Sequence, residues 1–386
     1  MFLKSPRKAL ILYGNPGVGK TSLIEYLFHY LSKLNLTYEI SGFITKELRE
    51  NNERIGFDLI YLKDTSFRLP LARRKDLVGY SQRKSPSVGK YIVFVENLNK
   101  FVEILERDLT ASKERSIVFI DEIGKMESYS EKFINLLENI WEEHLLVASL
   151  GKGDYPLLRE WAKKKDTLYV EVTFENRDFL KSRLEVEFSR KGKLFVFEGI
   201  DGVGKTTIFN KLREDKAFSH FLFSFEPTLG FYGQKIRNLL LNKKATSSEL
   251  LDLFLKDRQE HVEKVILPAL IKGKVLILDR YYLSTLAYQG DEETLLELLK
   301  KNETFSPMPD LVLYFELSPE EAIKRITQRG DKKSLFEKED SLRKIAKNYY
   351  KILSLFNYIT IPAWKSVETL YEEVRVLLEE FLRGET

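Results

Sequence analysis

The chain has 386 residues, no cysteine and a formal net charge of +4, from 62 basic and 58 acidic residues. The absence of cysteine excludes disulfides and thiolate metal sites, and the balanced charge does not indicate nucleic-acid binding. No apolar run approaches the length of a membrane span, and the N-terminus lacks a signal-peptide pattern, so we expect a cytoplasmic protein. The histidines lack metal-ligand spacing: they are His29, His144, His220 and His261.

The first motif follows the apolar run Ala9 to Tyr13. It matches G-x-x-x-x-G-K-[ST], a loop whose backbone N–H groups surround a phosphate chain while its lysine reaches the outer phosphates. The hydroxyl of Thr21 is expected to contact Mg²⁺, and Lys20 to act in catalysis. The residues predicted to bind nucleotide here are Gly14, Asn15, Pro16, Gly17, Val18, Gly19, Lys20 and Thr21.

Two strand-like segments, Ile40 to Lys46 and Arg54 to Tyr61, flank a polar turn and predict a hairpin beside the nucleotide fold. The stretch from Phe67 to Lys90 is basic and poor in apolar residues. A solvated loop is its main interpretation, with phosphate contact and a nucleic-acid patch as alternatives.

A buried strand is predicted at Ser116 to Glu122, because its apolar residues are continuous and end in two carboxylates. The carboxyl end of such a strand lies at the ligand edge of a parallel sheet. We therefore expect Asp121 to hold Mg²⁺ through water and Glu122 to orient an attacking water, both beside the nucleotide.

A second phosphate loop follows the apolar strand Phe195 to Glu198. Lys205 and Thr206 occupy the catalytic lysine and metal-ligand positions. The residues predicted to bind nucleotide here are Gly199, Ile200, Asp201, Gly202, Val203, Gly204, Lys205, Thr206 and Thr207.

Two loops this far apart indicate two domains, and the boundary is expected in the charged stretch Lys181 to Lys193. We assign residues 1–188 and 189–386 to two P-loop NTPase-type domains. Each is expected to be a three-layer α/β/α fold with a mostly parallel sheet, the first with an added β-hairpin.

The two halves differ after their second predicted strand. The first has Asp-Glu, which suits hydrolysis, whereas Val275 to Tyr281 carries Asp279 and Arg280. Transfer to a phosphate acceptor needs no base but does need cations that overcome repulsion between anions. From the residues alone, the first half is predicted to be a hydrolase and the second a kinase. The arginines proposed for phosphate contact are Arg237, Arg258, Arg280, Arg325 and Arg329.

The second half resembles thymidylate kinase over residues 193 to 384. The matching motifs, in family order, are Phe197 to Thr207, Leu253-Phe254 with Asp257-Arg258 and His261, Asp279 to Tyr281, Ser284-Thr285, Ala287 to Gly290, and Pro309 to Leu311. The resemblance implies Mg·ATP-dependent phosphorylation of dTMP to dTDP and a homodimer formed through this domain.

The resemblance also implies roles for single residues. Phe254 would stack on thymine and Arg258 contact the base, while Asp201 would accept the sugar 3′-hydroxyl. Tyr288 would crowd the 2′ position, Arg280 would bridge the two phosphates, and Asp279 would lie near the metal. The implied dTMP-binding residues are Asp201, Arg237, Phe254, Arg258, Arg280, Ser284, Tyr288 and Gln289.

Two features depart from the thymidylate kinase pattern. Phe225 replaces the arginine of Arg-Glu-Pro, which leaves another monophosphate acceptor open. The segment after Arg329, Gly330 to Ser334, is irregular for a lid. Because the phosphate loop has no basic residue between Gly199 and Gly204, the transition-state cations are expected from Arg325, Arg329 or Lys332.

The first half resembles the small nucleoside-triphosphatase family first associated with thermophiles, over about residues 5 to 186. The matching motifs are Gly14 to Thr21, Gly42 to Thr45 with Glu47 and Arg49, Arg54 to Phe57, Val88 to Tyr91, Ile120 to Glu127, and Glu175 to Asp178. The resemblance implies slow, Mg²⁺-dependent hydrolysis of several nucleoside triphosphates to diphosphates, and it adds Gly124 to the nucleotide-binding residues.

Other interpretations of the first half remain open. It is alternatively a nucleotide-switched regulatory module, whose slow hydrolysis times a conformational state. A nucleic-acid role would use the basic stretch Arg68 to Lys90. The sequence does not specify the preferred triphosphate or explain why the two halves are joined.

Overall fold

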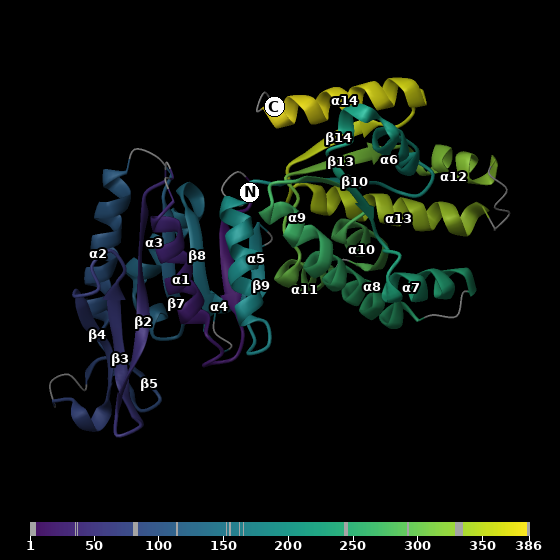
Figure 1. Cartoon of the computed structure of the whole chain (residues 1–386). Helices are drawn as coiled ribbons and strands as arrows, with labels where there is room; N and C mark the ends of the chain where they lie inside the picture. The colour runs from purple at the N-terminus through teal and green to yellow at the C-terminus, as the bar shows by residue number, and fades with distance from the viewer. Residues whose placement is uncertain are drawn as a thin grey trace. The chain divides into compact units, whose positions relative to one another are not determined.

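The computed structural model describes residues 5–34, 36, 38–79, 84–112, 115–151, 153, 156–161, 163–164, 166–242, 246–291, 293–328 and 335–383. The chain divides into two compact units, an N-terminal unit Arg7–Glu185 and a C-terminal unit that begins at Val186 and includes Ser5 and Pro6 (Figure 1). The division falls within the helix α5, Arg177–Ser189. Each unit has its own sheet flanked by helices, so the predicted fold class is confirmed.

The N-terminal unit contains a sheet that, over the described residues, has the order β5-β6-β4-β3-β2-β7-β8-β1-β9. The strands from β2 to β9 in this order are parallel neighbours, and the remaining pairs are antiparallel. The strand bounds are β1 Ala9–Tyr13, β2 Ile40–Glu50, β3 Glu53–Tyr61, β4 Arg68–Arg74, β5 Ser87–Val88, β6 Tyr91–Val93, β7 Ile117–Ile123, β8 Leu145–Leu150 and β9 Thr167–Glu171.

The predicted hairpin is confirmed, because β2 and β3 pair antiparallel. The loop predicted between Phe67 and Lys90 is wrong for Arg68–Arg74, which forms β4 beside β3. Leu71 and Ala72 are fully buried in that strand, so two apolar side chains and the pairing with β3 and β6 hold a basic segment in the sheet.

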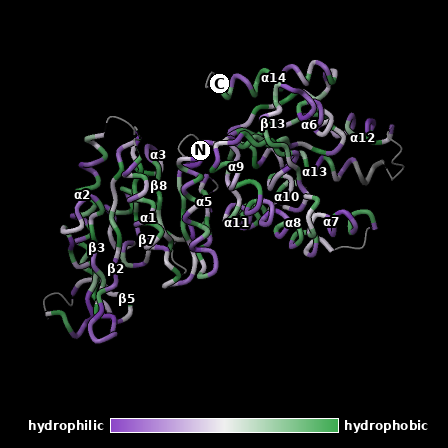
Figure 2. The backbone as a smooth tube through the Cα atoms, in the orientation of Figure 1, coloured by the Kyte–Doolittle hydropathy of each residue, from purple (hydrophilic) through white to green (hydrophobic). Residues whose placement is uncertain are grey.

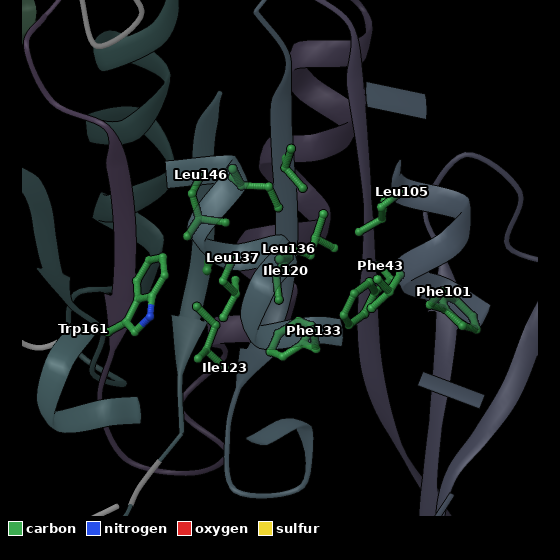
Figure 3. Packing of buried hydrophobic residues seen from close by; sticks show 14 of the residues in the cluster. Phe43, Phe101, Leu105, Ile120, Ile123, Phe133, Leu136, Leu137, Leu146 and Trp161 are labelled. Atoms are coloured by element: carbon green, nitrogen blue, oxygen red, sulfur yellow. The ribbon is translucent and has the colours of Figure 1, made fainter. Parts of the chain in front are cut away.

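The parallel part of this sheet has helices on its faces, among which α1 directly follows the first phosphate loop. Phe43 of β2 lies 5.7 Å from Phe101 and 6.2 Å from Phe133, measured between ring centroids, and these rings belong to the core in Figure 3. The helix bounds are α1 Lys20–Ser32, α2 Val95–Ala111, α3 Glu131–Glu143, α4 Pro156–Trp161 and α5 Arg177–Ser189. Short 3₁₀ turns lie at Lys75–Leu77 and Glu127–Tyr129.

The C-terminal unit has a parallel sheet of order β11-β12-β10-β13-β14. Its central strands are apolar runs buried on both faces, as the hydrophobic colour of β13 in Figure 2 illustrates. The strand bounds are β10 Lys193–Glu198, β11 Leu222–Phe225, β12 Val275–Asp279, β13 Leu311–Glu316 and β14 Tyr358–Pro362.

Helices surround this second sheet. Residues Ser247 to Ile271 form one continuous helical segment in which the π-turn Val262–Ile266 joins α8 to α9. The helix bounds are α6 Lys205–Glu214, α7 Phe231–Asn242, α8 Ser247–His261, α9 Leu267–Ile271, α10 Tyr282–Gln289, α11 Leu295–Phe305, α12 Pro319–Gln328, α13 Leu335–Leu353 and α14 Val367–Arg383, with a 3₁₀ turn at Lys216–Phe218. Within the described residues, no helix combines the length and apolar character needed to cross a bilayer.

Candidate active sites

The first phosphate loop connects β1 to α1 in the N-terminal unit. Gly17 and Gly19 have φ angles of 80° and 107°, a left-handed conformation that favours glycine. The loop therefore curls around the Lys20 ammonium, which donates to the carbonyl oxygens of Gly14 at 3.0 Å and Asn15 at 3.1 Å. A phosphate chain bound in this loop would give the buried lysine an anionic partner.

The predicted metal-binding residues of this loop are brought together across 100 positions of sequence. Thr21 Oγ1 donates to Asp121 Oδ2 at 2.6 Å, and Ser149 Oγ donates to Asp121 Oδ1. Burial raises the pKa of Asp121, whereas these two hydroxyls act against the rise. An all-oxygen donor set suits Mg²⁺, so Thr21 and Asp121 fit that ion. Ser149 was not predicted, because β8 lies between β1 and β7 only in the folded sheet.

Two further carboxylates approach the same edge of the sheet. A Cβ atom built on Gly124 would lie 3.1 Å from Glu122 Oε1 and 2.6 Å from Glu127 Oε2, so both side chains reach the α-carbon of this glycine. Burial, then the charge of Asp121, raises the pKa of Glu122. Burial, followed by the charge of Glu122, raises the pKa of Glu127 to about 8. Glu127 was not predicted as a site residue, but it is buried and its carboxylate lies beside Gly124 together with that of Glu122.

The basic segment of the N-terminal unit is partly neutralised by carboxylates. Arg73 pairs with Asp58, and Arg74 pairs with Glu53 at 2.6 Å and with Asp76 at 2.7 Å. These contacts hold β4 and the turn after it. They occupy two of the cations that a nucleic-acid patch would use.

The second phosphate loop repeats this arrangement in the C-terminal unit. Lys205 Nζ donates to the carbonyl oxygens of Gly199 and Ile200, both at 2.8 Å. Burial, together with the positive charge of Arg280, lowers the pKa of Lys205 to about 7. Thr206 Oγ1 donates to Asp279 Oδ2 at 2.7 Å.

Asp279 has an oxygen available for a cation. Its Oδ1 atom is buried and has no hydrogen-bond partner among the described residues. A buried acceptor without a donor is costly unless a ligand satisfies it. Asp279 and Thr206 therefore fit Mg²⁺, as the sequence predicts.

Arg280 is held over the second loop in an unusual backbone conformation. Its φ angle is 69°, the left-handed region that few residues with a Cβ adopt. The guanidinium donates to Asp201 Oδ1 at 2.5 Å, Ser284 Oγ at 2.9 Å and Tyr288 OH at 3.2 Å. Asp201 and Arg280 thus line a cavity of about 370 Å³ together with residues of the phosphate loop and Ile326 of α12, while Ser284 and Tyr288 of α10 hold the guanidinium.

Comparisons with known proteins match the two units separately. The family model described as thymidylate kinase matches residues 197–374, and the one described as NTPase matches residues 9–184. A thymidylate kinase from Desulfotalea psychrophila is 39% identical over 204 residues, which cover 50% of this chain and 96% of that protein. The chain belongs to the thymidylate kinase family.

Other relatives cover the same half. A probable thymidylate kinase from Pyrococcus abyssi is 38% identical over 203 residues, which cover 50% of this chain and 99% of that protein. The thymidylate kinase of Akkermansia muciniphila is 44% identical over 157 residues, or 40% of this chain and 75% of that protein. With the NTPase match, both predicted resemblances are confirmed.

In the thymidylate kinase unit, Glu198 anchors the helix that follows Arg280. Its Oε1 accepts from the backbone N–H of Tyr281 at 2.9 Å and of Ser284 at 3.2 Å. Its Oε2 accepts from Ser284 Oγ at 2.6 Å and Tyr349 OH at 2.8 Å. Glu198 was not predicted as a site residue, although it directly precedes the loop glycine, because its partners come from α10 and α13.

Arg258 lies in a buried network of the thymidylate kinase unit and is 1% exposed. It donates to Glu226 Oε2 at 2.8 Å, Asn302 Oδ1 at 2.5 Å and Thr285 Oγ1 at 3.0 Å. Burial of Glu226 opposes its ionisation, but the charge of Arg258 and the bond from His261 outweigh it and lower the Glu226 pKa. The base contact predicted for Arg258 stays a prediction.

The remaining residues predicted to bind dTMP lie on α7, α8 and α10. Arg237 donates to the carbonyl oxygens of Pro227 and Thr228, and its guanidinium carbon lies 5.8 Å from the ring centroid of Phe225. Phe254 is half-buried on α8. Gln289 Oε1 is buried without a hydrogen-bond partner among the described residues, as a ligand-binding atom would be.

The predicted lid cations are only partly described. Arg325 lies in the last turn of α12, one residue before Ile326 at the phosphate cavity. Arg329, Lys332 and the rest of the segment from Gly330 to Ser334 lie outside the described residues. Of the three predicted lid cations, Arg325 is therefore the one whose helix is described, and that helix borders the second phosphate loop through Ile326.

Proposed function

We propose that the chain is a bifunctional nucleotide enzyme of the cytoplasm. The C-terminal unit transfers the γ-phosphate of ATP to dTMP, which gives dTDP and ADP for dTTP synthesis. The N-terminal unit hydrolyses nucleoside triphosphates to diphosphate and phosphate. The family matches support each half, and the pairing of each loop threonine with an aspartate supports a Mg²⁺-dependent site in both.

In the kinase reaction, an oxygen of the dTMP phosphate bonds to the γ-phosphorus while the bond to the β–γ bridging oxygen breaks. Lys205 would hold the donor phosphates, and Arg280 would offset repulsion between donor and acceptor. Bound Mg²⁺ would supply positive charge to the transferring phosphate. The observation that carries this proposal is the position of Arg280, whose guanidinium lies above the loop between Asp201 and Ser284.

In the hydrolysis reaction, the proposed role of Glu122 is to orient a water in line with the γ-phosphate. Its carboxylate lies next to Asp121 and reaches Gly124 and Gly151 at the end of β7 and β8. No comparable carboxylate is expected after Asp279, where Arg280 follows. This difference supports a hydrolase in the first unit and a transferase in the second.

The sequence leaves the identity of the acceptor open, because Phe225 occupies the place of a family arginine. Arg237 packs against Phe225, which supports a retained cation close to this position. We therefore propose dTMP as the acceptor and another monophosphate as the alternative. A homodimer through the thymidylate kinase unit is also proposed, and the exposed Leu240 and Leu241 of α7 supply apolar surface for a second copy.

The test is ATP consumption by the full chain with Mg²⁺, in the absence of acceptor and with dTMP, dUMP, dGMP or dCMP. We expect dTMP alone to yield its diphosphate, above a slow release of free phosphate. Lys205→Ala should remove dTDP formation and leave phosphate release, and Lys20→Ala should do the reverse. Conversion of another monophosphate in place of dTMP would overturn the acceptor assignment, and loss of both activities in either variant would contradict two independent sites.

A further inference from the structure

The loop that follows β9 lies against the first phosphate loop. Val172 N donates to the carbonyl oxygen of Tyr13 at 2.8 Å, immediately before the first loop glycine. A Cβ atom built on Gly19, the last loop glycine, would lie 3.6 Å from Cδ of Arg177. The segment from Val172 to Arg177 therefore borders the phosphate loop at both of its ends.

The polar side chains of this segment are used by the segment itself. Asn176 Oδ1 accepts from Thr173 N at 2.8 Å, and its Nδ2 donates to the carbonyl oxygen of Glu171 at 2.8 Å. Thr173 Oγ1 accepts from Asn176 N at 3.3 Å. A hydrogen bond with Thr173 also lowers the pKa of Glu175. These groups hold the turn in shape and are not directed at a neighbouring ligand.

Phe174, Glu175 and Arg177 of this segment are exposed, and the side chains of Phe174 and Arg177 lie together. Phe174 is 61% exposed, which is unusual for a ring at the edge of a binding loop. The guanidinium carbon of Arg177 lies 5.6 Å from the centroid of this ring. The backbone N–H of Arg177 donates to Thr173 O at 3.2 Å, but within the described part of the chain its guanidinium has no hydrogen bond or ion pair that would orient it elsewhere. The guanidinium and the ring therefore lie together at the edge of the phosphate loop.

We propose that Phe174 and Arg177 form the nucleobase site of the N-terminal unit. A nucleotide whose phosphates occupy Gly14 to Thr21 would place its base against this pair, where it stacks on the ring and the guanidinium. This inference rests on the proposed hydrolysis of nucleoside triphosphates and identifies how their base is held.

The same contacts give a physical reason for the acceptance of several nucleoside triphosphates that the NTPase resemblance implies. Every nucleobase has a π-face, so a stacking site accepts any of them, whereas discrimination requires directed hydrogen bonds. Because Asn176 and Thr173 are already bonded within the segment, the site selects the triphosphate and not the base. We expect purines to be favoured modestly over pyrimidines, because their stacking area is larger.

The experiment measures phosphate release by the full chain from ATP, GTP, CTP, UTP and tripolyphosphate, which has the phosphate chain but no base. For the wild-type protein, kcat/KM of the four nucleotides should agree within about 20-fold, since stacking is tolerant of base identity. Phe174→Ala should raise KM for every nucleotide by about 5- to 100-fold, the loss expected for one stacked base, with little change in kcat. Its KM for tripolyphosphate should stay at the wild-type value.

Control variants and substrates distinguish the loss of base stacking from a general change in structure, and from the absence of any hydrolase activity. Phe174→Trp should restore nucleotide KM, and Leu77→Ala, which removes another exposed apolar side chain of this unit, should change nothing. An equal rise of KM for tripolyphosphate and ATP, or unchanged nucleotide KM in Phe174→Ala, would overturn the nucleobase site alone. A wild-type chain that hydrolyses neither nucleotides nor tripolyphosphate would overturn the proposed hydrolase as well.

Discussion

Replacement of Glu198 with alanine should slow the kinase reaction strongly while leaving ATP binding nearly intact. Glu198 is fully buried and ties the start of α10 to the strand that carries the second phosphate loop. Arg280 lies immediately before the first of these ties, and its own backbone N–H donates to Phe197 O at 3.0 Å. The substitution would free the residue after Arg280, and with it the left-handed backbone conformation that aims the guanidinium.

The size of the effect follows from the groups that lose a partner. The left-handed conformation of a residue with a Cβ costs about 1–2 kcal/mol, so an untied Arg280 should relax to negative φ. Loss of one preorganised group that stabilises transition-state charge typically lowers kcat about 10²- to 10³-fold. The buried N–H of Tyr281 would also lose its acceptor, whereas that of Ser284 keeps the carbonyl oxygen of Tyr281 at 3.0 Å, so the unit should be destabilised by about 1–3 kcal/mol.

The assay is steady-state formation of dTDP with separate variation of ATP and dTMP, together with thermal unfolding. For Glu198→Ala we expect kcat to fall about 100-fold and KM for ATP to change less than about threefold, because Lys205 and the loop N–H groups remain. Glu198→Gln keeps an acceptor oxygen for both N–H groups and should recover most of the rate. Phosphate release by the N-terminal unit serves as the internal control.

A clear result would refute this reasoning. If Glu198→Ala keeps kcat within about twofold of wild type while unfolding is destabilised, Glu198 contributes to stability and does not position Arg280. If Glu198→Gln is as slow as the alanine variant, the buried charge matters and the hydrogen-bond geometry does not. Either outcome would require another account of the Arg280 conformation.

Three further predictions follow from buried contacts. Asp279→Asn should raise the Mg²⁺ concentration that half-saturates dTDP formation about tenfold or more, because a metal-facing oxygen becomes an amide; an unchanged Mg²⁺ titration would exclude Asp279 as a ligand. Ser149→Ala should raise the Mg²⁺ requirement of phosphate release only, since it removes a donor that orients Asp121. Glu226→Gln should destabilise the C-terminal unit by about 3 kcal/mol in urea unfolding at pH 7, because Arg258 loses its buried counter-charge. Since the folded pKa of Glu226 is lowered, its stabilisation is complete above the unfolded pKa and is lost as pH falls through the folded one, so the wild-type advantage should shrink below about pH 4.

Local patterns predicted much of the architecture. Apolar runs ending in charge located β7 and β12, and the segment from Ile40 to Tyr61 was correctly predicted as a hairpin. The basic stretch after Phe67 was wrongly predicted as a loop, because it has few apolar residues. It forms a strand all the same, since β3 and β6 supply the hydrogen bonds and only a few of its side chains need to be buried. Sequence periodicity carries no information about such neighbours.

Both phosphate loops were determined by the sequence itself. Glycines at fixed spacing permit left-handed turns, and the adjacent lysine and threonine follow at the start of a helix, so a dozen consecutive residues contain the chemistry. The tertiary structure decided the partners of these loops. Ser149 reaches Asp121 because β8 lies between β1 and β7, and Glu198 meets Tyr349 because α13 packs beside α10. The physical reason is that these contacts depend on strand order and helix packing, which bring together residues that no local spacing relates.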